Sequence, residues 1–283
     1  MANTIDWGQA AVNNTNGFGK APTNNTIDFG EVCADSWSPE TNLTGAGATP
    51  SFSNTKSIEL DGIDDNVRIG TTSLGITNAI SISAWVKIPT TNTGGGGANI
   101  QVIACEDTTS SGQRNWNMFW RGTGSNYFAF VIHHTNLSAS SVVSTGIIPN
   151  DGQWHNLVGT FDGTTNANGL KLYIDGNLNV KGTAGSTGIN SFTSSEPNIG
   201  RITNQNVWNF EGNIDEVAVW DSAINISDVW DGSGVPFDIS SSNPLSWWRC
   251  GDNDTAPTLT DNGSGGNDGT MTNFSTFSTD VPT

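Results

Sequence analysis

The chain has 283 residues, of which 13% are charged, 34% are hydrophobic and 34 are glycine. Its 27 acidic and 10 basic residues give a formal net charge of −17, which excludes a surface built to bind the phosphate backbone of nucleic acids. An average soluble domain has about 25% charged residues and about 7% glycine. The low charge and the excess of glycine therefore favour an all-β protein with many tight turns, and they argue against helical bundles.

The sequence gives no indication of export or of membrane insertion. Residues 1–6 contain no basic segment followed by an apolar core, so we expect no secretory signal peptide. No run approaches 18 apolar residues, the length that predicts a membrane-spanning helix. The three cysteines, Cys33, Cys105 and Cys250, form no CxxC pair, so we expect free thiols and neither a zinc site nor a disulfide framework. These features predict a chain that folds in a cytoplasm.

An internal repeat occupies residues 1–34. Aromatic–glycine pairs begin at Trp7, Phe18 and Phe29, a strict period of 11 residues. The surrounding Asn, Thr and Gly oppose a helix, so we predict three short extended segments joined by turns, each anchored by one aromatic side chain. Two interpretations remain open: the arm docks on a partner through these three aromatic residues, or it covers its own domain.

Alternating apolar and polar residues are dense between about residues 57 and 220, and this pattern predicts strands. The dipeptide Asp175-Gly176 between two such runs predicts a hairpin. Only one helical turn is expected, with Ser227 as its N-cap. Many short strands separated by turns predict a two-sheet antiparallel sandwich or jelly roll. The candidate strands lie at residues 80–88, 99–105, 116–121, 127–133, 155–161, 198–202 and 213–220.

Five ordered motifs resemble the laminin G-like, concanavalin A-like jelly-roll family over roughly residues 55–232. The resemblance implies an all-β fold of two packed antiparallel sheets, one of them concave. The motifs are SIELDGIDDNV at 57–67, SISAWVK at 81–87, GQWHNLVGTFDG at 152–163, LYIDG at 172–176 and GNIDEVAVW at 212–220.

Two further segments resemble the beginning of a domain of this family, although here they lie near the C-terminus: LSWWRCGD at 245–252 and GNDGTMTN at 266–273. We therefore divide the chain into an N-terminal arm (1–34), a jelly roll (35–238) and a C-terminal segment (239–283). Circular permutation is the most economical explanation, because chain termini often lie close together. A strand exchanged with a neighbouring subunit and a truncated second domain are the alternatives.

The N-terminal repeat and the C-terminal segment also resemble virion proteins of tailed bacteriophages, particularly marine ones. The resemblance implies a non-enzymatic virion structural protein, of the capsid-decoration or fibre type, docked by its arm among other virion proteins. It further implies a homo-oligomer, assembly in the host cytoplasm and contact with host surface glycans. The alternative is a bacterial carbohydrate-binding module, followed by a glycoside hydrolase or lyase.

Catalytic residues are not expected. β-Glucanases that resemble this fold need two glutamates flanking an aspartate on one strand, and the run from Glu211 to Glu216 has a different spacing. Asp215 and Glu216 are adjacent, so strand geometry predicts that their side chains point to opposite faces. The neighbouring His133 and His134 accompany no nucleophile motif.

One short loop contains several oxygen ligands of the kind that calcium prefers: Asp61, Asp64 and Asp65, followed by Asn66. The sequence therefore suggests Ca²⁺ as a cofactor at the three aspartates. The alternative is that Asp61 makes a turn with Gly62 and that the other side chains cap backbone amides.

Eleven tryptophans suggest sugar binding, because an indole face can stack on a flat apolar group such as a sugar ring. Trp85, Trp154 and Trp220 lie inside the fold motifs, so we expect them in the core. Alternation along a strand shows which side chains share a face, but it does not show which face is concave. The remaining candidates for ligand binding are Trp116, Trp120, Tyr127, Trp208 and the Trp247-Trp248 pair.

Overall fold

The computed structural model describes residues 52–70, 72–92, 100–107, 113–122, 124–136, 138–147, 149–193, 196–202 and 207–283. All of these except Phe52 belong to one compact unit, Ser53–Thr283. The predicted repeats with Trp7, Phe18 and Phe29, as well as Cys33, lie outside the described residues.

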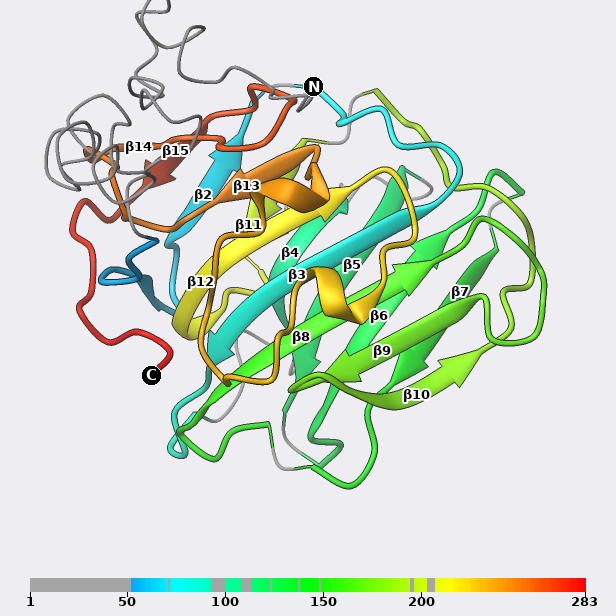
Figure 1. The fold of residues 1–283 in the computed structure, drawn as a ribbon, viewed down its shortest axis with the longest axis horizontal. Coiled ribbons are helices and arrows are strands. Elements are labelled where there is room, and N and C mark those ends of the chain that lie inside the picture. The colour runs from blue at the N-terminus through cyan, green and yellow to red at the C-terminus, as the bar shows by residue number, and fades with distance from the viewer. Residues whose placement is uncertain are drawn as a thin grey trace, which may run out of the picture. The chain divides into compact units, whose positions relative to one another are not determined.

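The described chain folds into two antiparallel sheets that pack as a sandwich (Figure 1). This confirms the predicted all-β, two-sheet architecture. The seven-stranded sheet has the order β1-β12-β3-β8-β9-β10, with β13 paired to β12. The eight-stranded sheet has the order β14-β15-β2-β11-β4-β5-β6-β7.

The strand bounds agree with most predicted strands to within a few residues. In the seven-stranded sheet they are β1 Ile58–Asp61, β3 Ile80–Lys87, β8 Trp154–Phe161, β9 Leu170–Ile174, β10 Asn177–Gly182, β12 Glu211–Trp220 and β13 Ser246–Trp248. In the eight-stranded sheet they are β2 Asn66–Ile69, β4 Ile100–Asp107, β5 Arg114–Arg121, β6 Tyr127–His133, β7 Ala139–Val143, β11 Pro197–Ile199, β14 Thr258–Leu259 and β15 Gly269–Thr272.

The core lies between the inner faces of the two sheets. Successive side chains of a strand point to opposite faces, so every second residue of β3, from Ile80 to Val86, belongs to one buried hydrophobic cluster. The opposite sheet contributes alternate residues of β5 and β6, among them Met118 and Phe130. The predicted hairpin joins β9 to β10 through Asp175 and Gly176, whose φ angles of 49° and 73° are those of a type I′ turn.

The C-terminal segment contributes strands to both sheets of the same chain. Strand β13 pairs with β12, and β14–β15 pairs with β2. Trp248, Leu259 and Met271 join the hydrophobic cluster between the sheets. Pairing within one chain is the arrangement that circular permutation requires, although the evolutionary event itself stays a prediction.

The connection after β12 crosses the outer face of the seven-stranded sheet (Figure 1). The indole of Trp230 stacks on that of Trp85, with ring centroids 5.6 Å apart and an interplanar angle of 26°. A short 3₁₀ helix here, Ile226–Asp228, has Asn225 as its N-cap. The expectation that Ser227 caps this turn is therefore wrong by two residues, since the Asp228 carboxylate accepts a hydrogen bond from the backbone N of Asn225 instead.

Gly159 permits a close contact between the two sheets. A Cβ atom added to Gly159 on β8 would lie 2.5 Å from Cγ of Phe130 on β6, and Phe130 is fully buried. We expect Gly159→Ala to lower the free energy of unfolding by about 1–3 kcal/mol, because a buried aromatic ring has to move. Chemical denaturation measures this change. Gly185→Ala is the matched control, since its added Cβ makes only an ordinary contact of 3.7 Å with Ser140, and an equal loss in both variants would contradict the explanation.

The C-terminal strands provide a second test of the fold. A chain that ends at Pro244 lacks the buried side chains of Trp248, Leu259 and Met271 and leaves β2 and β12 with unpaired edges. We expect this fragment to be insoluble, or soluble without a cooperative thermal transition, because large-to-small changes at single core positions already cost about 2–5 kcal/mol. A stable fragment that unfolds cooperatively in calorimetry would contradict this role of the segment.

Candidate functional site

Four of the six predicted ligand-binding residues are buried, and the Trp247-Trp248 pair on β13 is among them. Trp116 and Trp120 on β5 are each 1% exposed. Their indole nitrogens donate hydrogen bonds to Glu106 Oε2 (2.8 Å) and Asn126 Oδ1 (3.0 Å). Alternation along β5 turns these rings towards the opposite sheet, so neither offers a face to a sugar. The burial contradicts the prediction for these four residues.

The other two predicted residues, Tyr127 and Trp208, are both half-buried. Tyr127 pairs with Arg121 at the far end of β5, and its hydroxyl accepts a hydrogen bond of 3.4 Å from Arg121 Nη1. The Trp208 ring centroid is 5.7 Å from Cζ of Arg114, the first residue of β5, whereas the Trp208 backbone bonds Val102, which lies opposite Phe119. The two aromatic rings therefore contact different arginines, Tyr127 with Arg121 and Trp208 with Arg114.

Trp208 is held in an unusual backbone conformation. Its φ angle is +62°, in the left-handed region that bulky residues rarely adopt. Its carbonyl accepts a hydrogen bond of 2.9 Å from the backbone N of Val102 on β4. Strain of this kind costs about 1–3 kcal/mol and occurs preferentially at functional sites.

Polar side chains gather beside Trp208 on the outer face of the eight-stranded sheet. Asp107 Oδ1 lies 3.5 Å from Arg114 Nε, and Asp107 Oδ2 accepts a hydrogen bond of 3.0 Å from Asn117 Nδ2. His133, at the end of β6, adjoins Arg114 electrostatically. We refer to Asp107, Arg114, Asn117, His133 and Trp208 as the Trp208 cluster.

The strand register brings this cluster together. Strands β4, β5 and β6 are neighbours, and Asp107 is paired with Arg114 across a bulge. Because Trp116 and Met118 face the core, Asn117 between them faces outward. Asn115 is the extra residue of the bulge, and its side chain lies beside Glu106. His133 follows Ile132, the core-facing partner of Trp116, so its side chain also faces outward.

Two buried side-chain atoms of the cluster have neither a hydrogen-bond nor an ion-pair partner within the described part of the chain: Asn117 Oδ1 and His133 Nε2. A third, Asp107 Oδ1, accepts no hydrogen bond but lies in the ion pair with Arg114. Each buried polar atom left unpaired costs roughly 1–3 kcal/mol. Native proteins usually satisfy such atoms with ordered water or with a ligand. The outer face therefore has polar atoms that can form hydrogen bonds with water or with a ligand.

The cluster carries little net charge. Burial raises the pKa of Asp107 to about 7, although Arg114 and the hydrogen bond from Asn117 oppose this rise. Burial lowers the pKa of His133 to about 4, and the positive charges of Arg114 and His134 lower it further. Above pH 7 an ionised Asp107 thus balances Arg114 while His133 is neutral, so the site offers hydrogen-bond donors and acceptors without a free cation.

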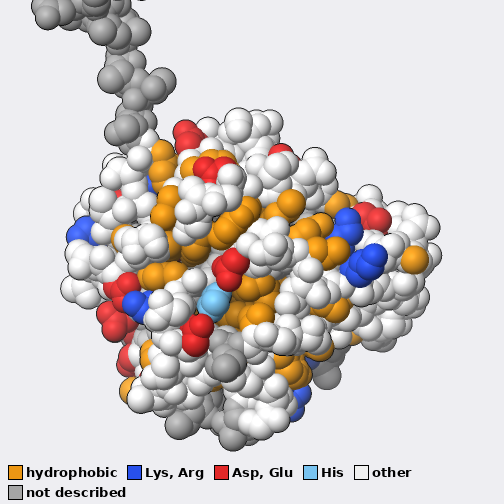
Figure 2. Space-filling view, turned by 60° about the horizontal axis from the view of Figure 1, so that its bottom comes forward, with side chains coloured by type: hydrophobic (Ala, Val, Ile, Leu, Met, Phe, Trp, Pro, Cys, Tyr) orange, Lys and Arg blue, Asp and Glu red, His pale blue; other side chains and the backbone are white. Residues whose placement is uncertain are grey.

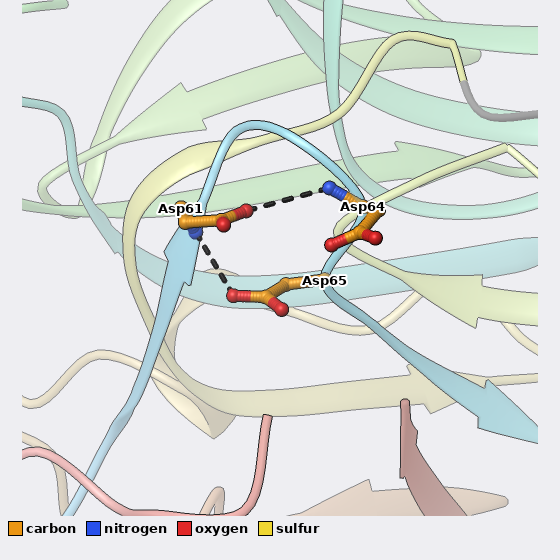
Figure 3. A group of neighbouring side chains, drawn as sticks. All are labelled: Asp61, Asp64 and Asp65. Atoms are coloured by element: carbon orange, nitrogen blue, oxygen red, sulfur yellow. Dashed lines mark hydrogen bonds between the residues drawn. The ribbon is translucent and has the colours of Figure 1, made fainter. Parts of the chain in front are cut away.

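The three predicted metal ligands do meet in one loop between β1 and β2 (Figure 3). One carboxylate oxygen from each of Asp61, Asp64 and Asp65 lies within 4.8 Å of the others. Calcium binds oxygen at about 2.3–2.6 Å, so oxygens on one ion can lie about 5 Å apart and this donor set fits. Burial raises the pKa of Asp65, against the backbone hydrogen bond from Asp61, and the charges of Asp61 and Asp64 add to the rise.

Hydrogen bonds inside the loop also fit the alternative interpretation as a turn. Asp61 Oδ1 accepts hydrogen bonds from the backbone N of Ile63 (2.8 Å) and of Asp64 (3.4 Å). Asp65 Oδ2 accepts one from the backbone N of Asp61 at 3.1 Å. These bonds use one oxygen of each of the two acceptor carboxylates, so the turn and a bound cation do not exclude each other.

Asp215 and Glu216 belong to a buried network on β12. Glu216 has a φ of +47° and lies in a bulge, which interrupts the alternation that predicted opposite faces for these two side chains. Glu216 accepts hydrogen bonds from Arg249 Nε (3.0 Å) and Trp247 Nε1 (2.6 Å), and Asn54 donates one to Asp215. Burial raises the pKa of Glu216 to about 7 despite Arg249. Both carboxyl groups are thus buried and hydrogen-bonded within the chain.

Basic side chains in the view of Figure 2 form only small, separate groups among acidic and hydrophobic ones. This face therefore has no continuous basic surface for a nucleic acid backbone. Within the described ranges, no helix combines the length and the hydrophobicity that crossing a membrane requires.

Comparisons with solved structures give neighbours that are mostly carbohydrate-binding domains. A putative carbohydrate-binding protein from Bacteroides ovatus has a TM-score of 0.60 at 17% identity, over 82% of this chain and 62% of that one. A heptameric SAP-like pentraxin from Limulus polyphemus has a TM-score of 0.47 at 14% identity, over 61% and 79%. The CBM40 of the Ruminococcus gnavus IT-sialidase, bound to α2,3-sialyllactose, has a TM-score of 0.44 at 12% identity, over 63% and 96%.

These identities establish a shared fold alone, and this chain spans less than two thirds of the Bacteroides protein. No curated protein matches the sequence. The sequence pattern of one family does match, over residues 61–230, which is more than half of the chain. The chain therefore belongs to the concanavalin A-like lectin/glucanases superfamily, as a laminin G-type domain.

Proposed function

We propose that this protein is a non-enzymatic carbohydrate-binding module and that the Trp208 cluster is its ligand site. The family and its structural neighbours support carbohydrate binding in general terms. One observation supports the location: a half-buried tryptophan in a strained conformation contacts Arg114 of a polar cluster that contains two buried atoms without partners among the described residues.

The cluster combines the two kinds of contact that sugar recognition uses. An aromatic ring can stack on the apolar face of a sugar ring, and fixed polar groups orient its hydroxyls. The Trp208 ring is supported by the Arg114 guanidinium at 5.7 Å, while the polar atoms come from three neighbouring strands. Ligand sites of this kind place a few polar groups precisely on a rigid scaffold.

The virion role inferred from the sequence stays a prediction. It depends on the repeats around Trp7, Phe18 and Phe29, which lie outside the described residues. The proposed homo-oligomer, the virion partners and the virion location are likewise untested. A glycan site on the sandwich is compatible with either a virion protein that touches host glycans or a bacterial module.

Removal of the Trp208 ring tests the site. We expect Trp208→Ala to weaken binding to its glycan at least about tenfold, which corresponds to 1.4 kcal/mol, because the stacking surface is lost. A glycan array identifies the ligand and titration calorimetry measures the dissociation constant. Trp154→Ala removes another half-buried indole, located on the seven-stranded sheet, and should bind as the wild type does. Unchanged affinity of Trp208→Ala, with cooperative unfolding retained, would refute this location.

We also propose that Asp61, Asp64 and Asp65 bind Ca²⁺. A free Ca²⁺ concentration of 100 times the dissociation constant would stabilise the fold by about 2.7 kcal/mol. The melting temperature should therefore be higher in millimolar Ca²⁺ than with a chelator. Asp64→Asn should abolish this difference, because it removes the charge of one proposed ligand. The loop hydrogen bond of Asp64 is made by its backbone N and not by its carboxylate, so the substitution keeps that bond. An identical melting temperature with Ca²⁺ and with the chelator would eliminate the metal site.

A further inference from the structure

The charges of the Trp208 cluster are already balanced within the protein. Arg114 carries the positive charge of the cluster, and it faces the Asp107 carboxylate at 3.5 Å and the Trp208 ring at 5.7 Å. The Asp107 side chain is 1% exposed, whereas that of Arg114 is 37% exposed. A ligand can therefore approach the Arg114 guanidinium from solvent, whereas the Asp107 carboxylate that balances its charge is buried.

An anionic ligand would gain little at this site. A carboxylate that binds Arg114 must approach the ionised Asp107, and like charges at short range are unfavourable in a poorly solvated site. His133 supplies no compensating charge, because its pKa of about 4 keeps it neutral. The formal net charge of −17 adds a long-range repulsion of anions.

Hydroxyl groups match the unpaired atoms. A hydroxyl both donates and accepts hydrogen bonds, and the cluster offers an acceptor at Asn117 Oδ1 and an imidazole nitrogen at His133 Nε2. These atoms are buried, so a sugar contacts them only after the groups above them shift.

We propose that the Trp208 cluster selects uncharged sugars and discriminates against sugars that carry a carboxylate, with the Asp107–Arg114 pair as the selectivity determinant. This inference rests on the proposed function, because it names the ligand class of the same site. The pair cancels the charge that an arginine would otherwise offer to sialic or uronic acids.

A substitution that removes the negative charge balancing Arg114 tests the selectivity. Neutral oligosaccharides and their sialylated or uronate-containing counterparts are compared by glycan array and titration calorimetry at pH 8, where Asp107 is ionised. We expect the wild type to bind a neutral glycan at least tenfold more tightly than its acidic counterpart. Asp107→Asn keeps the size of the side chain but leaves Arg114 unbalanced, so it should shift the ratio at least tenfold towards acidic glycans.

The control is Asp221→Asn, which changes the net charge equally at an exposed position after β12 and should leave the ratio unchanged. If Asp107→Asn fails to unfold cooperatively, Arg114→Gln replaces it, and this variant should keep or enlarge the preference for neutral glycans. A smaller preference in Arg114→Gln would overturn the inference.

The outcomes separate the two levels of the proposal. If the wild type binds acidic glycans as tightly as neutral ones or more tightly, the selectivity inference fails while carbohydrate binding stands. The same holds if Asp107→Asn and Asp221→Asn shift the ratio equally. If no glycan of either class shows saturable binding, carbohydrate binding itself is refuted.

Discussion

Packing between the inner faces of the two sheets is the contact on which the other features of this protein depend. It buries alternate residues of each central strand, from Ile80 on β3 to Phe130 on β6, and burial of apolar surface is the dominant favourable term in folding. The same alternation sends the intervening residues outward. The outward position of Asn117 in the Trp208 cluster thus follows from the burial of Trp116 and Met118.

Different parts of the chain lie on the outer faces of the two sheets. The connection after β12 crosses the outer face of the seven-stranded sheet, where Trp230 stacks on Trp85. Beside it, the carboxyl groups of Asp215 and Glu216 are satisfied by Asn54, Trp247 and Arg249. Removing one partner of such a buried pair would leave an uncompensated charge. Buried polar atoms without a partner among the described residues occur on both sheets, at Asn54 and Asn156 on one side and in the Trp208 cluster on the other.

Most of the fold could be predicted from the sequence because strand patterns and Asp-Gly turns are local signals. The candidate site could be predicted only in part. Trp208 was among the predicted ligand-binding residues. Asp107 and Arg114 were not, because they lie just beyond the predicted strands at 99–105 and 116–121. Polar residues at strand ends do not alternate with apolar ones, so their membership in the sheet leaves no periodic signal.

The sequence by itself determined the family, the two-sheet sandwich, the Asp175-Gly176 hairpin and the grouping of three aspartates in one loop, because each depends on neighbours in the chain. Only the tertiary structure decided which tryptophans are core residues, since both faces of a strand look alike until one packs against the other sheet. It also decided that Glu216 lies in a bulge, which no alternation rule anticipates. The Trp208 cluster joins three strands and a distant loop, and such contacts arise only from strand register and packing.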